Sequence, residues 1–316
     1  MINYLRAPAP APVAFAVCLF GWVIATPPSA RPQAVEAEPL DYTLDLMDRS
    51  GDTFKVQLAV DDLGPENAVY QFASTAPGTY QVMDIGRFVR RFEAVDADGA
   101  IIPSEQISTN QWRISRPGDV VEIRYELAET WDTPVEEHTL YLMTGTSLED
   151  DHAQINGQAV FGYPTGMQLR PLRIRLLHST EWVVGTALEA DSTGWYRADD
   201  YDHVVDSPIL VGTLSVASLE VRGTAVDVFT YSKTGAVKSE QILDAVRDVL
   251  TAAADFLGEL PVDRYAFLFH FEDVTMGAWE HSYSSTYAFA ESDFEALLQL
   301  SLIHISEPTR PNAPSR

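Results

Sequence analysis

The 316-residue chain is poor in cysteine and in basic residues. Its single cysteine, Cys18, lies in an apolar N-terminal stretch, so removal of that stretch would leave a chain without thiols. Such a chain forms no disulfides and performs no thiol catalysis. Only 21 Lys and Arg residues stand against 46 Asp and Glu residues, which gives a formal net charge of −25 at pH 7. Because this charge repels phosphate backbones, we expect no nucleic-acid partner.

One long apolar run occurs near the N-terminus, and it is too short to cross a bilayer. Val13–Ala25 follows the basic residue Arg6 and is almost wholly apolar. This pattern is typical of the core of a signal peptide. We therefore expect residues 1–37 to be a signal peptide, cleaved after Ala30 or Ala37, and the protein to be secreted or periplasmic with no other membrane attachment. An uncleaved N-terminal anchor is the alternative.

The C-terminal residues carry a separate signal. Leu300–Arg310 reads LSLIHISEPTR, which matches the conceptual translation of a transposase adapter used in sequencing libraries. We interpret residues 300–316 as a sequencing artefact that interrupts the natural reading frame near Gln299, and we assign no role to His304. A natural apolar tail with a proline-rich end is the alternative.

Apolar and polar residues alternate with the period of a β-strand over residues 41–221. Tyr42, Leu44 and Leu46 show this alternation first. Further strands are expected over 54–60, 88–95, 112–114, 120–127, 172–177, 182–184 and 209–219. Many short strands separated by turns predict an antiparallel β-sandwich, so we expect a β-rich N-terminal domain over 38–222.

The pattern changes near residue 226. Val226–Tyr231 reads as a strand, and apolar residues then recur at helical spacing over 242–257. Gly258 is expected to end this helix. Tyr265–Phe271 follows and is apolar enough for a strand that is buried on both faces. A strand, a long helix and a second strand predict the start of an α+β domain over 223–299, which we expect to be truncated.

The segment Gly277-Ala278-Trp279-Glu280-His281 follows the apolar strand and carries candidate binding residues. A carboxylate beside a sheet edge, such as that of Glu280, can hold a free α-ammonium group through a charge-assisted hydrogen bond of about 1.5–3 kcal/mol. The small residues Gly277 and Ala278 would let a substrate backbone approach closely. Taken without any further evidence, the segment is better explained as a surface glutamate beside a histidine on an irregular loop.

Four segments in order resemble the N-terminal half of the glycyl aminopeptidase-type zinc metallopeptidases, a gluzincin family. The segments are Ala76–Tyr80 with Ile85–Val89, Asp150–Gly157 with Phe161 and Tyr163, Phe256–Pro261 with Tyr265, and Gly277–His281. Together they span residues 41–290, and Ala278 stands where the family has a second glycine. The resemblance implies a β-rich N-terminal domain followed by a thermolysin-like catalytic domain and a PDZ domain.

The resemblance also implies a function for the segment 277–281. Glu280 would anchor the N-terminus of a peptide substrate, with Gly277 and Ala278 beside it, and His281 would orient Glu280, line the pocket or serve the fold. The full-length enzyme would use zinc held by an H-E-x-x-H helix. No such motif occurs in the chain, so we expect no zinc on this fragment and no hydrolysis by it. A non-catalytic β-sandwich binding protein of the cell envelope, or a structural domain of a larger assembly, is the alternative.

Acidic residues beside histidines occur at three other places and could bind a metal ion. These are Glu136-Glu137-His138, Asp150-Asp151-His152, and His203 with Asp202 and Asp206. Such neighbours are common on an acidic surface, so we expect them to be surface groups. His270 and Glu272 share one face of the expected strand, and a buried histidine with a glutamate at the rim explains that pair.

Overall fold

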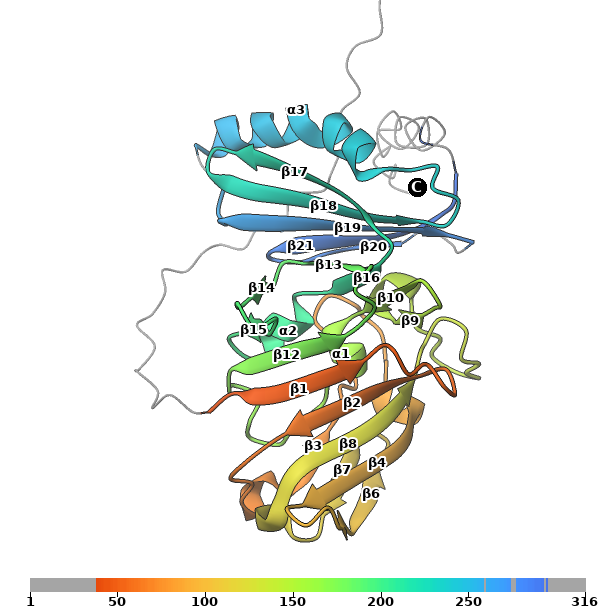
Figure 1. Cartoon of the computed structure of the whole chain (residues 1–316), viewed down its shortest axis with the longest axis vertical. Helices are drawn as coiled ribbons and strands as arrows, with labels where there is room; N and C mark the ends of the chain where they lie inside the picture. Colours follow the sequence, from red (N-terminus) through yellow and green to blue (C-terminus); the bar gives the residue numbers. More distant parts are fainter. Residues whose placement is uncertain (1–37, 259, 274–276, 293, 295–316) are drawn as a thin grey trace, which may run out of the picture.

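The computed structural model describes residues 38–258, 260–273, 277–292 and 294, so the expected signal peptide (1–37) and the adapter-like tail (300–316) lie outside the described residues. Figure 1 shows an N-terminal body made of β-sheets, with a further five-stranded sheet and one long helix stacked on it. Three sheets make up the N-terminal body. None of the helices in the described ranges is long and apolar enough to cross a membrane.

The N-terminal body is a sandwich of two sheets. The larger has the order β14-β15-β12-β1-β2-β8-β4-β5 and the smaller has the order β11-β3-β7-β6. The strands of the larger are β14 (Glu189–Ala190), β15 (Tyr196–Ala198), β12 (Leu172–Leu177), β1 (Leu40–Asp45), β2 (Thr53–Ala59), β8 (Val120–Ala128), β4 (Val89–Asp96) and β5 (Ile101–Ile102). Those of the smaller are β11 (Tyr163–Pro164), β3 (Val69–Gln71), β7 (Gln111–Ile114) and β6 (Ser104–Ser108).

Aromatic side chains fill the space between these two sheets. Phe72 is fully buried, and its ring meets those of Tyr125 and Trp112 edge-on, at centroid distances of 5.0 and 5.4 Å. Strands β7 and β8 belong to different sheets, because the chain crosses between the layers at the short 3-10 helix η3 (Pro117–Asp119). The expected β-rich fold is confirmed, with one parallel pair, β1 with β12, in the otherwise antiparallel larger sheet.

A third sheet connects the sandwich to the rest of the chain. Its order is β13-β16-β10-β9, with β13 (Val183–Thr186), β16 (Ile209–Gly212), β10 (His152–Ile155) and β9 (Ser147–Leu148). The short helices α1 (Gly157–Val160) and α2 (Tyr201–Val205) lie beside it in Figure 1. Of the 3-10 helices in this body, η2 (Ile85–Phe88) contacts α1, η4 (Leu142–Thr144) contacts β20 (Gly277–Glu280) of the five-stranded sheet, and η1 (Pro65–Asn67) contacts η3 of the sandwich. All residues of β10 and β16 are buried, so this sheet forms the interior between the two parts of the molecule.

The second part of the chain is a five-stranded sheet covered on one face by a helix. Its order is β17-β18-β19-β21-β20, with β17 (Ser215–Val221), β18 (Thr224–Ser232), β19 (Arg264–Glu272), β21 (Ser284–Ala290) and β20 (Gly277–Glu280). The helix α3 (Ser239–Leu257) packs its apolar stripe against the odd-numbered residues of β19, including Phe267 and Phe271. Leu268, on the opposite face, packs with Leu210 of β16.

The strand expected over 209–219 divides between two sheets. The chain leaves the third sheet after Gly212 and enters the five-stranded sheet as β17. This strand pairs with β18 over seven residue pairs, from Ser215↔Thr230 to Val221↔Thr224. The expected boundary at 222/223 would separate these paired strands. Sheet pairing instead groups β17 with the second part of the chain.

Truncation of Phe72 tests the sandwich core. We expect Phe72→Ala to lower the free energy of unfolding by about 3–5 kcal/mol, because it leaves a cavity among packed rings. Phe256→Ala is the matched control, since Phe256 is 82% exposed on α3 and an exposed substitution changes stability by no more than about 0.5 kcal/mol. Urea unfolding of both variants measures the difference, and equal effects would contradict the described core.

Candidate active-site edge

The candidate segment forms the edge strand of the five-stranded sheet. Among the residues that the structure describes, strand β20 (Gly277–Glu280) pairs only with β21, in an antiparallel register that places Glu280 opposite Ser285. The other side of β20 therefore presents backbone N–H and C=O groups that an extended peptide can pair with. Glu280 is exposed at the end of this strand.

The pairing register assigns the side chains of β20 to opposite faces of the sheet. Ala278 lies opposite Tyr287, whose ring stacks on Phe269 at 4.5 Å on the face that carries α3. Glu280 shares this face. Tyr265 lies close by, and burial together with the Glu280 carboxylate raises the pKa of Tyr265 to about 12, with the hydrogen bond to Ser285 opposing the rise.

Gly277 and Trp279 face the N-terminal body instead. A Cβ added at Gly277 would lie 2.7 Å from Sδ of Met143 in η4. The Trp279 ring packs against the core of the N-terminal body and lies 4.4 Å from the His281 ring. Trp279 thus packs on the opposite face from Glu280. Because Gly277 has no side chain, the Met143 side chain can lie directly against its backbone.

His281 is held by an aspartate far away in the sequence. Its Nδ1 lies 3.2 Å from Oδ1 of Asp206, and the Ser282 N–H donates to Oδ2 at 3.1 Å. The His281 side chain is buried, 2% exposed. Burial alone would raise the pKa of Asp206, but the hydrogen bonds from His281 and Ser282 outweigh it and the pKa is lowered. Asp206, expected to be a surface group beside His203, in fact fixes the turn that follows Glu280.

The loop carrying Met143 is fixed by three side-chain amides. Asn156 Nδ2 donates to the carbonyls of Met143 and Gly145 at 3.0 and 2.7 Å, and Gln158 Nε2 donates to that of Thr144 at 2.9 Å. Gln154 Nε2 donates to Leu142 O at 3.4 Å. Asn156 belongs to the Ile-Asn-Gly segment of the sequence. Through η4 this segment sets the position of β20.

The remaining acidic and histidine groups have separate roles. His203 Nδ1 accepts a hydrogen bond from Asp199 N at 3.1 Å, and Asp202 is exposed. The carbonyls of Glu137 and His138 accept hydrogen bonds from Arg87. Neither group collects ligands for a metal ion among the residues the structure describes.

Two groups of three ligand-type side chains do converge within the described ranges. One comprises Asp52, Glu129 and Asp132, and the other comprises His152, His270 and Glu272. In the first, Glu129 accepts hydrogen bonds from Asp132 N and Trp131 N at 2.8 and 3.1 Å, so its carboxylate caps a turn. Burial, and next the neighbouring Asp132, raise the pKa of Glu129 to about 8. In the second, His152 was predicted to be a surface group beside Asp150 and Asp151 but is buried, whereas His270 and Glu272 are the predicted buried histidine and rim glutamate.

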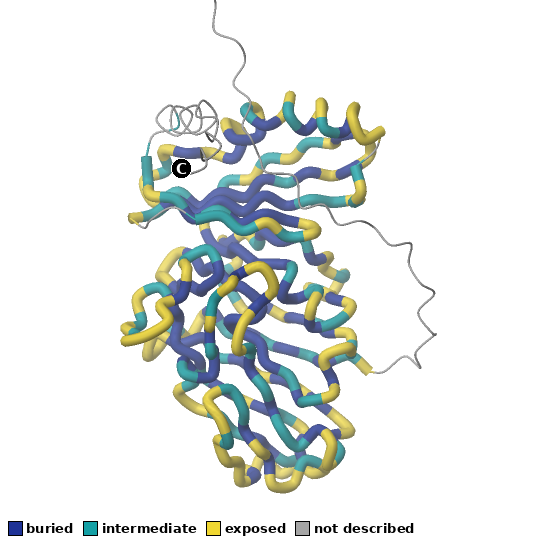
Figure 2. Tube along the Cα trace, turned by 180° about the vertical axis from the view of Figure 1, so that it is seen from behind, coloured by how far each residue is buried: buried dark blue, intermediate teal, exposed yellow. Residues whose placement is uncertain are grey.

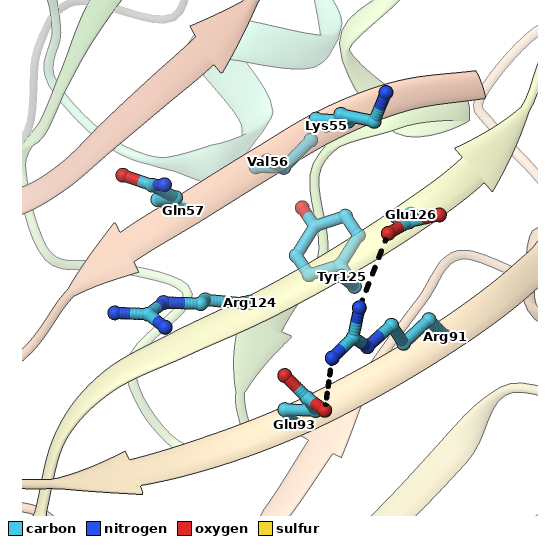
Figure 3. A pocket seen from close by; sticks show the side chains of 8 residues that line it. All are labelled: Lys55, Val56, Gln57, Arg91, Glu93, Arg124, Tyr125 and Glu126. Carbon is cyan, nitrogen blue, oxygen red and sulfur yellow. Dashed lines mark hydrogen bonds and ion pairs between the residues drawn. The ribbon is translucent and has the colours of Figure 1, made fainter. Parts of the chain in front are cut away.

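The outer face of the larger sheet also carries a shallow hollow. Figure 3 shows it crossed by ion pairs: Arg91 contacts Glu93 at 2.7 Å and Glu126 at 3.7 Å. Arg91 and Glu93 both lie on β4, whereas the pair with Glu126 joins β4 to β8 and supports the pairing of these neighbouring strands. The hollow is formed by β2, β4 and β8 of the sandwich, whereas Glu280 is on the second sheet.

Comparison with known proteins identifies the N-terminal body. The sequence profile of the Peptidase M61 N-terminal domain matches residues 41–213. No curated protein matches the chain.

One solved structure shares the fold of the chain. An aminopeptidase N family protein from Idiomarina loihiensis superposes with a TM-score of 0.70 at 22% identity, covering 84% of this chain and 46% of that one. At this identity the similarity shows a common fold. An M1 zinc metallopeptidase from Deinococcus radiodurans is more distant, with a TM-score of 0.43 at 13% identity over 85% of this chain and 64% of its own. The chain therefore spans about half the length of the first of these structures.

The Asp206 contact can be tested by hydrogen exchange. We expect Asp206→Asn to speed exchange of the Ser282 amide by about tenfold, because hydrogen bonds to a charged acceptor are the stronger kind. Asp202→Asn, at an exposed position of the short helix α2 that Asp206 follows, is the control and should leave exchange of this amide unchanged.

The pH dependence of the same amide follows from the lowered pKa of Asp206. A lowered pKa means that the contact contributes its full stabilisation above the ordinary aspartate pKa of about 3.9 and loses it as the pH falls below that value. Protection of the Ser282 amide should therefore be constant from pH 7 to pH 5 and decline below about pH 4. Protection of this amide that is already lost between pH 7 and 6 would contradict the assignment of the contact to the Asp206 carboxylate.

Proposed function

The chain belongs to the M61 peptidase family through its N-terminal domain, and on this premise we propose that it is the N-terminal part of a secreted zinc aminopeptidase of the glycyl aminopeptidase type. In this proposal the complete enzyme cleaves an N-terminal peptide bond, and a PDZ domain follows its catalytic domain. The residues described here supply the substrate-binding edge.

One observation carries the proposal: an exposed glutamate ends a strand that lies at the edge of its sheet among the residues the structure describes. A peptide substrate would add to β20 as a further strand, and Glu280 would accept hydrogen bonds from its terminal ammonium group. The neighbouring turn is anchored by the hydrogen bonds of His281 and Ser282 to Asp206. A fixed carboxylate at the end of a strand selects peptides whose N-terminus is free.

Zinc belongs to the complete enzyme in this proposal. Strand β20 supplies one carboxylate and no set of zinc ligands, and the chain contains no H-E-x-x-H. When bound by such a helix, zinc would activate the water that attacks the peptide bond. The part of the protein described here would bind and orient the peptide, and by itself it should not hydrolyse peptides.

The source locus provides a direct test. Sequencing past the codon for Gln299 should reveal an H-E-x-x-H motif in the same reading frame in place of the adapter-like residues. A natural stop codon at that point would instead support the non-catalytic binding protein. Chelator-sensitive aminopeptidase activity of the purified 316-residue chain would overturn the assignment of the zinc ligands to a following helix.

Replacement of the proposed anchor should weaken recognition of the free N-terminus. In the complete enzyme we expect Glu280→Gln to reduce kcat/KM for a peptide with a free N-terminus by roughly 10–150-fold, since a charge-assisted hydrogen bond contributes about 1.5–3 kcal/mol. Glu220→Gln is the matched control, because Glu220 is an exposed glutamate on β17, at the opposite edge of the same sheet. Equal activity of the two variants would remove Glu280 from the site.

A further inference from the structure

A buried group of three metal-ligand side chains lies where the third sheet meets the five-stranded sheet. His152 comes from β10, and His270 and Glu272 come from β19. One ligand atom from each lies within 4.8 Å of the others. The side chains of His152 and His270 are each 1% exposed, whereas that of Glu272 is 15% exposed. We call these three residues the bridging cluster.

The Nδ1 atom of each imidazole lies within hydrogen-bond distance of an acceptor. His152 Nδ1 lies 2.9 Å from Asp151 Oδ1, and His270 Nδ1 lies 2.9 Å from Gln154 Oε1. The Gln154 amide nitrogen donates to Leu142 O, which leaves its oxygen as the acceptor. Each histidine therefore donates its Nδ1 proton, and in the neutral ring the lone pair is on Nε2.

The Nε2 atom of each imidazole lacks a hydrogen-bond partner among the described residues. Nε2 of His152 and Nε2 of His270 are both buried, and neither forms a hydrogen bond with any described residue. The nearest carboxylate oxygen, Glu272 Oε2, lies 3.6 Å from His270 Nε2, beyond hydrogen-bond length. Buried nitrogens of this kind are costly unless a further group satisfies them.

Aromatic rings hold the two imidazoles in place. The Tyr231 ring stacks on His152 at 3.7 Å, and the Trp131 ring stacks on His270 at 4.6 Å. The hydroxyl of Tyr231 donates to Asp151, the acceptor that orients His152. The orientation of both ligands is thus fixed before any ion binds, which lowers the entropic cost of binding.

The charge around the cluster suits a cation. Glu272 contributes a carboxylate, and Asp151 lies behind His152. Lys233 Nζ lies 3.4 Å from the other oxygen of Glu272, Oε1, which leaves Oε2 facing His270.

We propose that the bridging cluster is a binding site for a divalent transition-metal ion of the zinc type, held by Nε2 of His152, Nε2 of His270 and the carboxylate of Glu272. Two neutral imidazoles and one carboxylate are ligands that zinc prefers. Acceptors behind both histidines, a carboxylate for one and an amide oxygen for the other, give the outer contacts that ligating histidines have in metal sites.

The spacing of the ligand atoms agrees with this assignment. A tetrahedral zinc ion with bonds of about 2.0–2.1 Å separates its ligands by roughly 3.3–3.4 Å. The 3.6 Å between His270 Nε2 and Glu272 Oε2 is close to that value. One ligand atom of His152 lies within 4.8 Å of the ligand atoms of the other two residues. The exposed side of Glu272 gives water access to a fourth position.

The proposed ion would join two separate parts of the chain. His152 belongs to the sheet that borders the sandwich, whereas His270 and Glu272 belong to the central strand of the second sheet. An ion held by both would stabilise the docking of these parts. The inference is independent of the proposed peptidase function, because it uses no residue of β20.

Zinc titration of the full chain tests the proposal. After treatment with a chelator and dialysis, the chain is titrated with Zn²⁺ against a chromophoric competitor. We expect one ion per chain, and a rise in Tm of roughly 5–10 °C at a Zn²⁺ concentration about 100-fold above the Kd. Absence of binding, or binding with no change in Tm, would overturn it.

Variants identify the ligands. His152→Ala and His270→Ala should each abolish the Tm rise, and Glu272→Gln, a conservative change at the rim, should weaken zinc binding at least tenfold with the fold preserved. Asp151→Asn should weaken it by about 10–100-fold through the orientation of His152. His178→Ala is the control outside the cluster and should bind as the parent chain does. Binding that survives both the His152 and His270 substitutions would place the ion elsewhere and refute the site.

Discussion

The hydrogen bonds from three side-chain amides to one loop hold the functional part of this molecule together. The carbonyls of residues 142–145 accept from Gln154, Asn156 and Gln158, which alternate along β10 and α1. This loop places Met143 against Gly277 at the start of the edge strand. Because the amides are buried, each one left without an acceptor would cost about 1–3 kcal/mol, so the loop has little freedom to move.

The backbone that follows these amide-bearing residues is held by tyrosines of the sandwich. Tyr125, Tyr201 and Tyr42 donate their hydroxyl protons to the carbonyls of Val160, Phe161 and Gly162, respectively. These three tyrosines come from β8, α2 and β1, so separate elements converge on one short stretch of backbone. The β-rich domain thus serves as the rigid support from which the second sheet and its edge are positioned.

Much of the fold could be predicted from the sequence, because the alternation of apolar residues is a local signal. The helical period over 242–257 predicts α3, the continuous apolar run over 265–271 predicts β19, and both elements are confirmed. The candidate site was harder to predict from the sequence, because its contacts join residues that are far apart in the chain. His281 meets Asp206 across 75 residues and His270 meets Gln154 across 116. No local pattern joins such positions, so Asp206 and the bridging cluster emerged only from the three-dimensional arrangement.

The parallel pairing of β1 with β12 has a consequence for how the chain folds. β1 begins at Leu40 and lies between β2 and β12, and it pairs in register with Leu172–Leu177, more than a hundred residues later. During synthesis β1 and β2 can associate early, yet one edge of β1 stays open until residue 177 has emerged. Contacts of such separation make folding slow. The intervening residues include 154–158, which carry the three amides. The pairing of β1 with β12 can therefore form only after these residues have been synthesised.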